Sequence, residues 1–128
     1  PKECVKQARR VRKLFGGAMR QAGLLAGACI YAMDHHIDRL AEDHANAKIV
    51  ADAVSRVSAF RLAPPRVETN LVWFDVDPAY GTGQDVVAKL RERGVRVSAL
   101  GTHTVRACTH YGVSREDCER AAEAVRRL

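Results

Sequence analysis

The 128-residue sequence lacks an apolar run long enough to cross a bilayer. Its longest weakly polar stretch, Ala22 to Met33, falls short of the about 20 apolar residues that a membrane helix needs. No basic segment followed by an apolar core and a small-residue cleavage site opens the chain. We therefore expect no membrane segment and no secretory leader. Because residue 1 is a proline, with no initiator methionine, we interpret the sequence as a fragment or a processed chain.

The sequence also lacks the spacing patterns of metal sites. Its five histidines form no H-E-x-x-H motif, and its four cysteines match no zinc template. We therefore predict no metal site, and we interpret the cysteines as free, mostly buried thiols. Free thiols favour a reducing compartment, so we expect a cytoplasmic protein. The cysteines are Cys4, Cys29, Cys108 and Cys118.

The net charge of +6 is concentrated at one end of the chain. Residues 1–20 hold seven basic side chains and one acid, whereas the remaining 108 residues hold 14 of each. A local positive field can meet nucleic acid, a membrane surface or a phosphorylated small molecule. No aromatic residue interleaves with the basic ones before Phe15, and no nucleic-acid reader motif is present, so we expect no nucleic-acid partner.

The first half of the chain predicts three helices. A basic helix over residues 3–14 should end at Gly16-Gly17, because glycine is costly inside a helix. A second helix, apolar nearly all round, should run from Ala18–Met19 to about Met33, and Asp34 can cap the third. Apolar spacing of three and four gives the third helix an inward face. That face comprises Ile37, Leu40, His44, Ala47, Val50, Val54 and Val57, with His44 as a hydrogen-bonded core residue.

The second half predicts a small sheet with covering helices. Residues 67–76 read as a strand, residues 84–93 as a helix ended by Gly94, and residues 95–100 and 104–109 as short strands. Ser114 and Asp117 form a capping box for the last helix. The predicted class is α+β: long helices, then a mostly antiparallel sheet. We place one unit over residues 1–33 and a small C-terminal domain over 34–128.

The segment RKLFGGAMRQAG, from Arg12 to Gly23, can bind an anion. Lys13 and Arg20 flank the two glycines, whose backbone N–H groups can approach a phosphate closely. It matches neither the Walker loop nor the dinucleotide G-x-G-x-x-G motif. The alternative is a helix break with solvated surface charge.

The segment TVRACTH, from Thr104 to His110, carries Arg106 among apolar residues on a short strand. A guanidinium on a rigid strand is suited to clamping a carboxylate with two hydrogen bonds. The alternative is an exposed strand arginine with no ligand. His110 fits a strand end or a site equally well, and the sequence does not separate the two.

Together these segments resemble the low-specificity L-threonine aldolases. The similarity covers most of residues 9–120 and rests on GG-x-MRQAG, LAEDHANA, the TN-strand of VETNLVWFDV and VRA-x-TH-x-x-VSRED, which occur in family order. It implies the α/β aminotransferase-like fold with pyridoxal 5'-phosphate as cofactor, of which this chain would be the C-terminal α+β portion. It further implies cleavage of L-threonine or L-allo-threonine to glycine and acetaldehyde by a homotetramer.

The resemblance assigns roles to three residues. Lys13 and Arg20 match the basic pair that reaches the cofactor phosphate from an adjacent subunit, and Arg106 matches the arginine that binds the substrate carboxylate. The lysine that forms the Schiff base lies upstream in the family, and no lysine here matches its motif, so we expect the chain alone to be inactive. Ala18 replaces a family glycine, and Tyr111-Gly112 replaces a leucine–aspartate pair.

Two other functions remain as alternatives. A degenerate, non-catalytic interaction module derived from an aldolase would use the apolar helix against a partner surface. A related lyase with the same cofactor, such as a β-eliminating enzyme, is the other; MRQAG and TH-x-x-VSRED argue against it. The preference between threonine and allo-threonine is not encoded in this segment.

Overall fold

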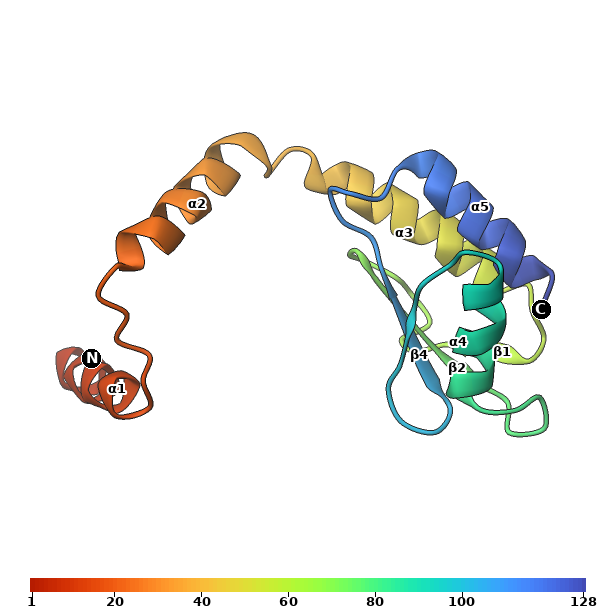
Figure 1. Ribbon diagram of the computed structural model, residues 1–128, viewed down its shortest axis with the longest axis horizontal. Coiled ribbons are helices and arrows are strands. Elements are labelled where there is room, and N and C mark those ends of the chain that lie inside the picture. Colours follow the sequence, from red (N-terminus) through yellow and green to blue (C-terminus); the bar gives the residue numbers. More distant parts are fainter. The chain divides into compact units, whose positions relative to one another are not determined.

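The computed structural model describes all residues from Pro1 to Leu128. They form two units, Pro1–Asp38 and Arg39–Leu128, and each unit is described here by itself (Figure 1). The division after Met33 that we drew from the sequence stays a prediction. None of the helices is both long and apolar enough to cross a membrane.

The N-terminal unit consists of two helices, α1 (Lys2–Leu14) and α2 (Ala22–His35). The predicted basic helix is confirmed. Gly16 ends it with a φ of 76°, a left-handed conformation that favours glycine. No residue of either helix is buried within the unit, so the apolar surface of α2 has no cover there.

Two predictions about α2 are wrong. The helix begins at Ala22, not near Ala18–Met19, because residues 18–21 form the connection that follows the left-handed glycine. It continues through Asp34 to His35, so Asp34 lies inside α2 and caps no third helix. The ring of Tyr31 packs on that of His35, one turn further along, at a centroid distance of 4.3 Å, which stabilises this last turn.

The C-terminal unit contains a four-stranded antiparallel sheet in the order β1-β2-β4-β3. The strands are β1 (Phe60–Leu62), β2 (Leu71–Val76), β3 (Ser98–Ala99) and β4 (Thr104–Cys108). β2, β3 and β4 confirm the predicted strands, with shorter limits. β1 was not predicted, since three residues before a proline pair give too short a pattern for recognition.

In the C-terminal unit two helices pack on this sheet, and a third helix packs on one of them. α3 (Leu40–Val54) packs against α5 (Arg115–Arg126) and against β1 and β2, and α4 (Gly83–Glu92) packs against β3 and β4 (Figure 1). The core lies between these helices and one face of the sheet. Its largest fully buried side chains are Val54, Val72, Phe74, Val86, Leu90, Val105 and Cys118.

Local capping signals are confirmed at two helices. Ser114 and Asp117 form the predicted capping box of α5, and Thr82 and Asp85 form a second one at α4. Gly94 has a φ of 78° and follows the end of α4 as expected. These helix ends depend on backbone geometry within four residues, which local sequence encodes well.

The inward face predicted for the third helix needs correction at its N-terminal end. Ile37 and Leu40 are exposed and His44 is half-buried, whereas Asp43 and Asn46 are buried. Asp43 tolerates burial because its charge is paired with the Arg39 guanidinium, with N–O distances of 2.8 and 3.1 Å. Arg39 in turn lies over the ring of Tyr111, 4.9 Å from its centroid. This pairing across one helical turn replaces the apolar contact that the periodicity predicted.

The prediction of mostly buried thiols is also wrong. Only Cys118 is buried, while Cys4, Cys29 and Cys108 are exposed and all four are free. Cys118 lies on the inner face of α5, whereas Cys4 and Cys29 lie in the unit that has no core of its own.

Candidate functional site

Arg106 lies in the middle of β4, on the face of the sheet opposite the core. Side chains alternate between the two faces of a strand, and its neighbours Val105 and Ala107 pack in or against the core. Its direct cross-strand partner is Trp73 of β2. The guanidinium carbon of Arg106 lies over the Trp73 ring, 5.7 Å from its centroid, within the range of a cation–π interaction.

No acidic side chain neutralises Arg106. Asp75 stands on the same face of β2, two residues beyond Trp73, yet its carboxylate is bonded elsewhere. It accepts a hydrogen bond of 2.9 Å from the hydroxyl of Thr104, and it forms an ion pair of 3.4 Å with Arg61. Arg106 therefore presents a half-buried positive charge with an aromatic ring behind it and no carboxylate against it, which suits it to bind an external carboxylate.

Lys13 and Arg20 lie in the N-terminal unit, in the last turn of α1 and in the connection before α2. Both are exposed and neither forms an ion pair with an acid. The predicted backbone contribution of the glycines is not formed, because their N–H groups are bonded within the end of α1. Gly16 donates to the carbonyl of Lys13 at 3.2 Å, and Gly17 donates to that of Arg12 at 2.8 Å.

The turn after α1 leaves little room for a side chain at Gly17. A Cβ at this position would lie 3.0 Å from the Cγ of Arg12 and 3.2 Å from its carbonyl oxygen, so a larger residue would push this turn apart. Ala18, which stands where the resembled family has a third glycine, is exposed in the segment that follows. The turn therefore relies on Gly16 and Gly17.

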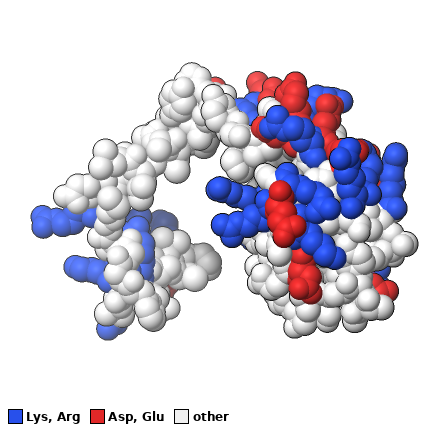
Figure 2. All heavy atoms as spheres, turned by 45° about the vertical axis from the view of Figure 1, so that its right-hand side comes forward, with Lys and Arg blue, Asp and Glu red and all other residues white.

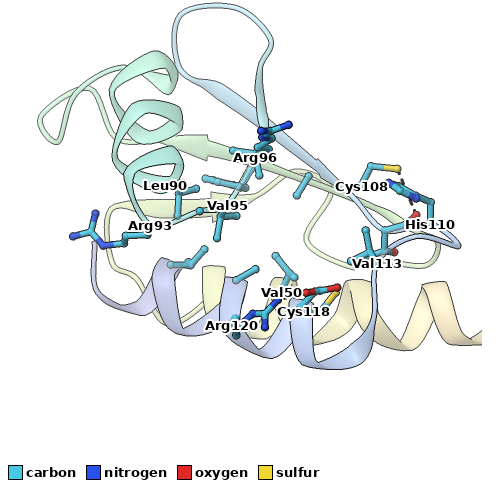
Figure 3. A pocket seen from close by; sticks show the side chains of 18 residues that line it. Val50, Leu90, Arg93, Val95, Arg96, Cys108, His110, Val113, Cys118 and Arg120 are labelled. Carbon is cyan, nitrogen blue, oxygen red and sulfur yellow. Dashed lines mark hydrogen bonds and ion pairs between the residues drawn. The ribbon is translucent and has the colours of Figure 1, made fainter.

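His110 lies just beyond β4 and is exposed. Its ring Nδ1 accepts a hydrogen bond of 3.2 Å from the backbone N–H of Gly112, which closes the turn toward α5. It also lines a cavity of about 550 Å³ beneath the segment that follows α4 (Figure 3). Apolar side chains such as Leu90 and Val95 line the cavity together with charged ones such as Arg96 and Arg120, and Arg106 does not line it.

The charged surface differs between the two units. Figure 2 shows basic and acidic groups intermixed on the C-terminal unit, whereas the N-terminal unit carries basic groups beside broad uncharged surface. The uncharged part includes exposed apolar side chains of α2 such as Leu24, Leu25 and Ile30. The charge separation that the sequence predicted is therefore visible on the folded chain.

Sequence reasoning missed Trp73 and Asp75 as neighbours of Arg106. Their alternation in LVWFDV places both on one face of β2, and that signal was available. The missing information was the pairing register between β2 and β4, which sets Trp73 opposite Arg106 and Asp75 opposite Thr104.

Comparison with known proteins finds one matching family profile and several similar proteins. The sequence profile described as beta-eliminating lyase matches residues 1–77. The low specificity L-threonine aldolase of Escherichia coli K12 is 37% identical over 94% of this chain, and the probable low-specificity L-threonine aldolase 2 of Arabidopsis thaliana is 32% identical over 92%. The alanine racemase TOXG of Cochliobolus carbonum is 30% identical over 73%. The chain spans about a third of the length of the two aldolases.

A solved structure shows the same fold. The cysteine desulfurase CsdA from Escherichia coli superposes on 87% of this chain with a TM-score of 0.69 and 24% identity, and this chain covers 31% of it. The predicted aminotransferase-like fold class is thereby confirmed, and family and fold together indicate pyridoxal phosphate as the cofactor of the full enzyme. With more than half of its residues matched by that profile, the chain belongs to the beta-eliminating lyase family.

Proposed function

We propose that this chain supplies the substrate-carboxylate and cofactor-phosphate contacts of a pyridoxal-phosphate-dependent L-threonine aldolase. The family and the aldolase relatives support a lyase acting on an amino acid. The family name and the racemase relative describe other reactions, so the aldol cleavage itself is part of the proposal. The single observation that carries it is Arg106, unpaired on the open face of the sheet.

Arg106 would bind the carboxylate of the amino acid. A guanidinium offers two parallel N–H groups to a carboxylate, and Arg106 has no internal acid to compete. A substrate bound through its carboxylate keeps a fixed orientation about Cα. That orientation decides which bond of Cα can break. Orientation of this kind contributes to catalysis by removing rotational freedom before reaction.

Lys13 and Arg20 would bind the phosphate of the cofactor. The donor set fits that group, because an ammonium and a guanidinium, both exposed and without acidic partners, can each donate to phosphate oxygens. In this arrangement the side chains provide the contacts, since the N–H groups of Gly16 and Gly17 are already bonded. When bound, pyridoxal phosphate supplies an electron sink for the charge left on Cα.

We further propose that the full enzyme is a homo-oligomer. α2 is apolar nearly all round and buries none of its residues within its own unit. Such a helix is stable in water only when other surfaces cover it. In the proposed homo-oligomer a second subunit provides that cover.

The first experiment concerns the covalent lysine. We expect the 128-residue chain, mixed with pyridoxal phosphate and reduced with borohydride, to show no single stoichiometric adduct by intact mass. None of Lys2, Lys6, Lys13, Lys48 and Lys89 matches the family motif. One full adduct on one lysine would contradict the proposal that the catalytic lysine lies outside this segment.

The second experiment concerns the reaction. In the enzyme that contains this segment, acetaldehyde release from L-threonine should be measurable by coupled oxidation of NADH. Arg106→Lys should raise KM for threonine by at least about tenfold, since a lost charge-assisted hydrogen bond is worth about 1.5–3 kcal/mol. Arg91→Lys, an exposed change on α4, is the matched control. Unchanged threonine kinetics in Arg106→Lys would remove Arg106 from the site.

A further inference from the structure

We propose that Trp73 is a positioning residue that holds the Arg106 guanidinium ready for the substrate carboxylate. The inference rests on the proposed function for the identity of the carboxylate. Nothing in the sequence motifs or in the comparisons assigns a role to Trp73. It is the only tryptophan of the chain, and it stands directly opposite Arg106 in the sheet.

The geometry begins with the register of β2 and β4. Val72 and Phe74, on either side of Trp73, are buried in the core, so the strand cannot rotate the indole away from the open face. The half-buried indole therefore offers a fixed platform beside β4. The Arg106 guanidinium lies over this platform, 5.7 Å from the ring centroid.

A platform of this kind lowers the cost of binding. A free arginine side chain has many rotamers, and immobilising it on a ligand costs conformational entropy. A guanidinium stacked on an aromatic face keeps its edge N–H groups available for a carboxylate in the same plane. Trp73 would therefore act before the ligand arrives, by restricting Arg106 to conformations that bind.

The hydrogen bonds and the ion pair of Asp75 leave Arg106 without an internal acidic partner. Residues diagonal to each other on one face of a sheet lie about 7–8 Å apart at their backbones, within reach of an arginine. Asp75 is diagonal to Arg106 and would be its natural internal partner. Thr104 and Arg61 occupy its carboxylate oxygens instead, so Arg106 is left for an external acid.

Kinetics of the complete enzyme test the inference. Trp73→Leu should raise KM for threonine by about two- to fivefold with little change in kcat, because a cation–π contact that is partly open to solvent is modest in strength. Trp73→Phe, which keeps an aromatic face, should recover part of that loss. Leu71→Ala, on the same face of the same strand, is the control and should leave KM unchanged. Equal KM values in Trp73→Leu and the parent enzyme would overturn the inference.

A spectroscopic measurement separates this inference from the proposed function. Ring currents of an indole shift nearby protons to lower frequency, so the side-chain protons of Arg106 should be displaced in the NMR spectrum of the 128-residue chain. The displacement should vanish in Trp73→Leu and persist in Leu71→Ala. If the complete enzyme fails to cleave threonine while this shift is present, the proposed substrate is wrong and the positioning role stands. Absence of the shift in the parent chain would refute the positioning role, whatever the substrate.

Discussion

The hydroxyl of Thr109 donates a hydrogen bond of 2.6 Å to the backbone carbonyl of Asp43, which lies 66 residues earlier in the chain. This bond ties the segment that follows β4 to the first turn of α3. The backbone N–H of Thr109 also donates to the carbonyl of Asn70 at 3.0 Å, which connects the same point to the start of β2. The C-terminal end of β4, the strand that carries Arg106, is thereby fixed on two sides.

Replacing Thr109 by valine should therefore lower the stability of the C-terminal unit. Thr109 is buried, and valine has its shape without the hydroxyl. We expect a loss of about 1 kcal/mol in the free energy of unfolding, the net worth of one hydrogen bond. Urea unfolding measures the loss, with Thr102→Val, an exposed position, as control. Equal midpoints for the two variants would contradict the role of the Thr109 hydroxyl.

The acid stability of the chain should depend on its two capping boxes. Hydrogen bonds from Thr82 lower the pKa of Asp85, and hydrogen bonds from Ser114 lower that of Asp117. A carboxyl whose pKa is lower in the folded state stabilises the fold above its unfolded pKa, and this contribution is lost as pH falls through the folded value.

The urea midpoint of the parent chain should fall as the pH drops below the ordinary aspartate pKa of about 3.9. We therefore expect a smaller fall in the double variant that carries Asp85→Asn and Asp117→Asn. Asp52→Asn, an exposed change within α3, should leave that slope unchanged. If the urea midpoint of the double variant falls with pH as steeply as that of the parent chain, these two carboxylates contribute nothing to the acid stability.

The two thiols of the C-terminal unit should differ in reactivity. Burial raises the pKa of the Cys118 thiol, so less of it is thiolate at neutral pH, and the side chain is also shielded. Cys108 is exposed. With Cys4 and Cys29 replaced by serine, a disulfide reagent should label Cys108 rapidly and Cys118 only after denaturant is added. Fast labelling of both thiols in the native chain would contradict the buried position of Cys118.

Glycine at position 83 should be required for the packing of α4 on the sheet. A Cβ there would lie 3.2 Å from the carbonyl oxygen of Thr104 and 3.3 Å from a methyl group of Val105, and the backbone oxygen cannot rotate away. We expect Gly83→Ala to destabilise the C-terminal unit by about 1–3 kcal/mol in thermal or urea unfolding.

Gly23→Ala provides the matched control, because a Cβ at Gly23 would meet nothing within 4 Å. Alanine also favours helix over glycine, so this variant should not destabilise α2. Equal unfolding midpoints for Gly83→Ala and the parent chain would show that α4 can move away from β4 without cost.

The sequence by itself determined the features that depend on neighbouring residues. The basic helix α1, the left-handed Gly94 and the capping box of Ser114 and Asp117 were all predicted. Each rests on interactions within about four residues, which composition and spacing express directly. The resemblance to aldolases was likewise carried by short local motifs, and the family match and relatives confirm it.

Only the tertiary structure decided which residues meet across the chain. The burial of Asp43 depends on an ion pair that interrupts an apolar periodicity. The cation–π contact of Arg106 with Trp73 depends on the register of β2 and β4, which brings together two residues 33 positions apart in the sequence. Many registers satisfy the same alternation of side chains, so the pattern alone could not choose one. Packing of Val72, Phe74 and Val105 against the helices selects the register, and that selection places an aromatic ring beneath the arginine.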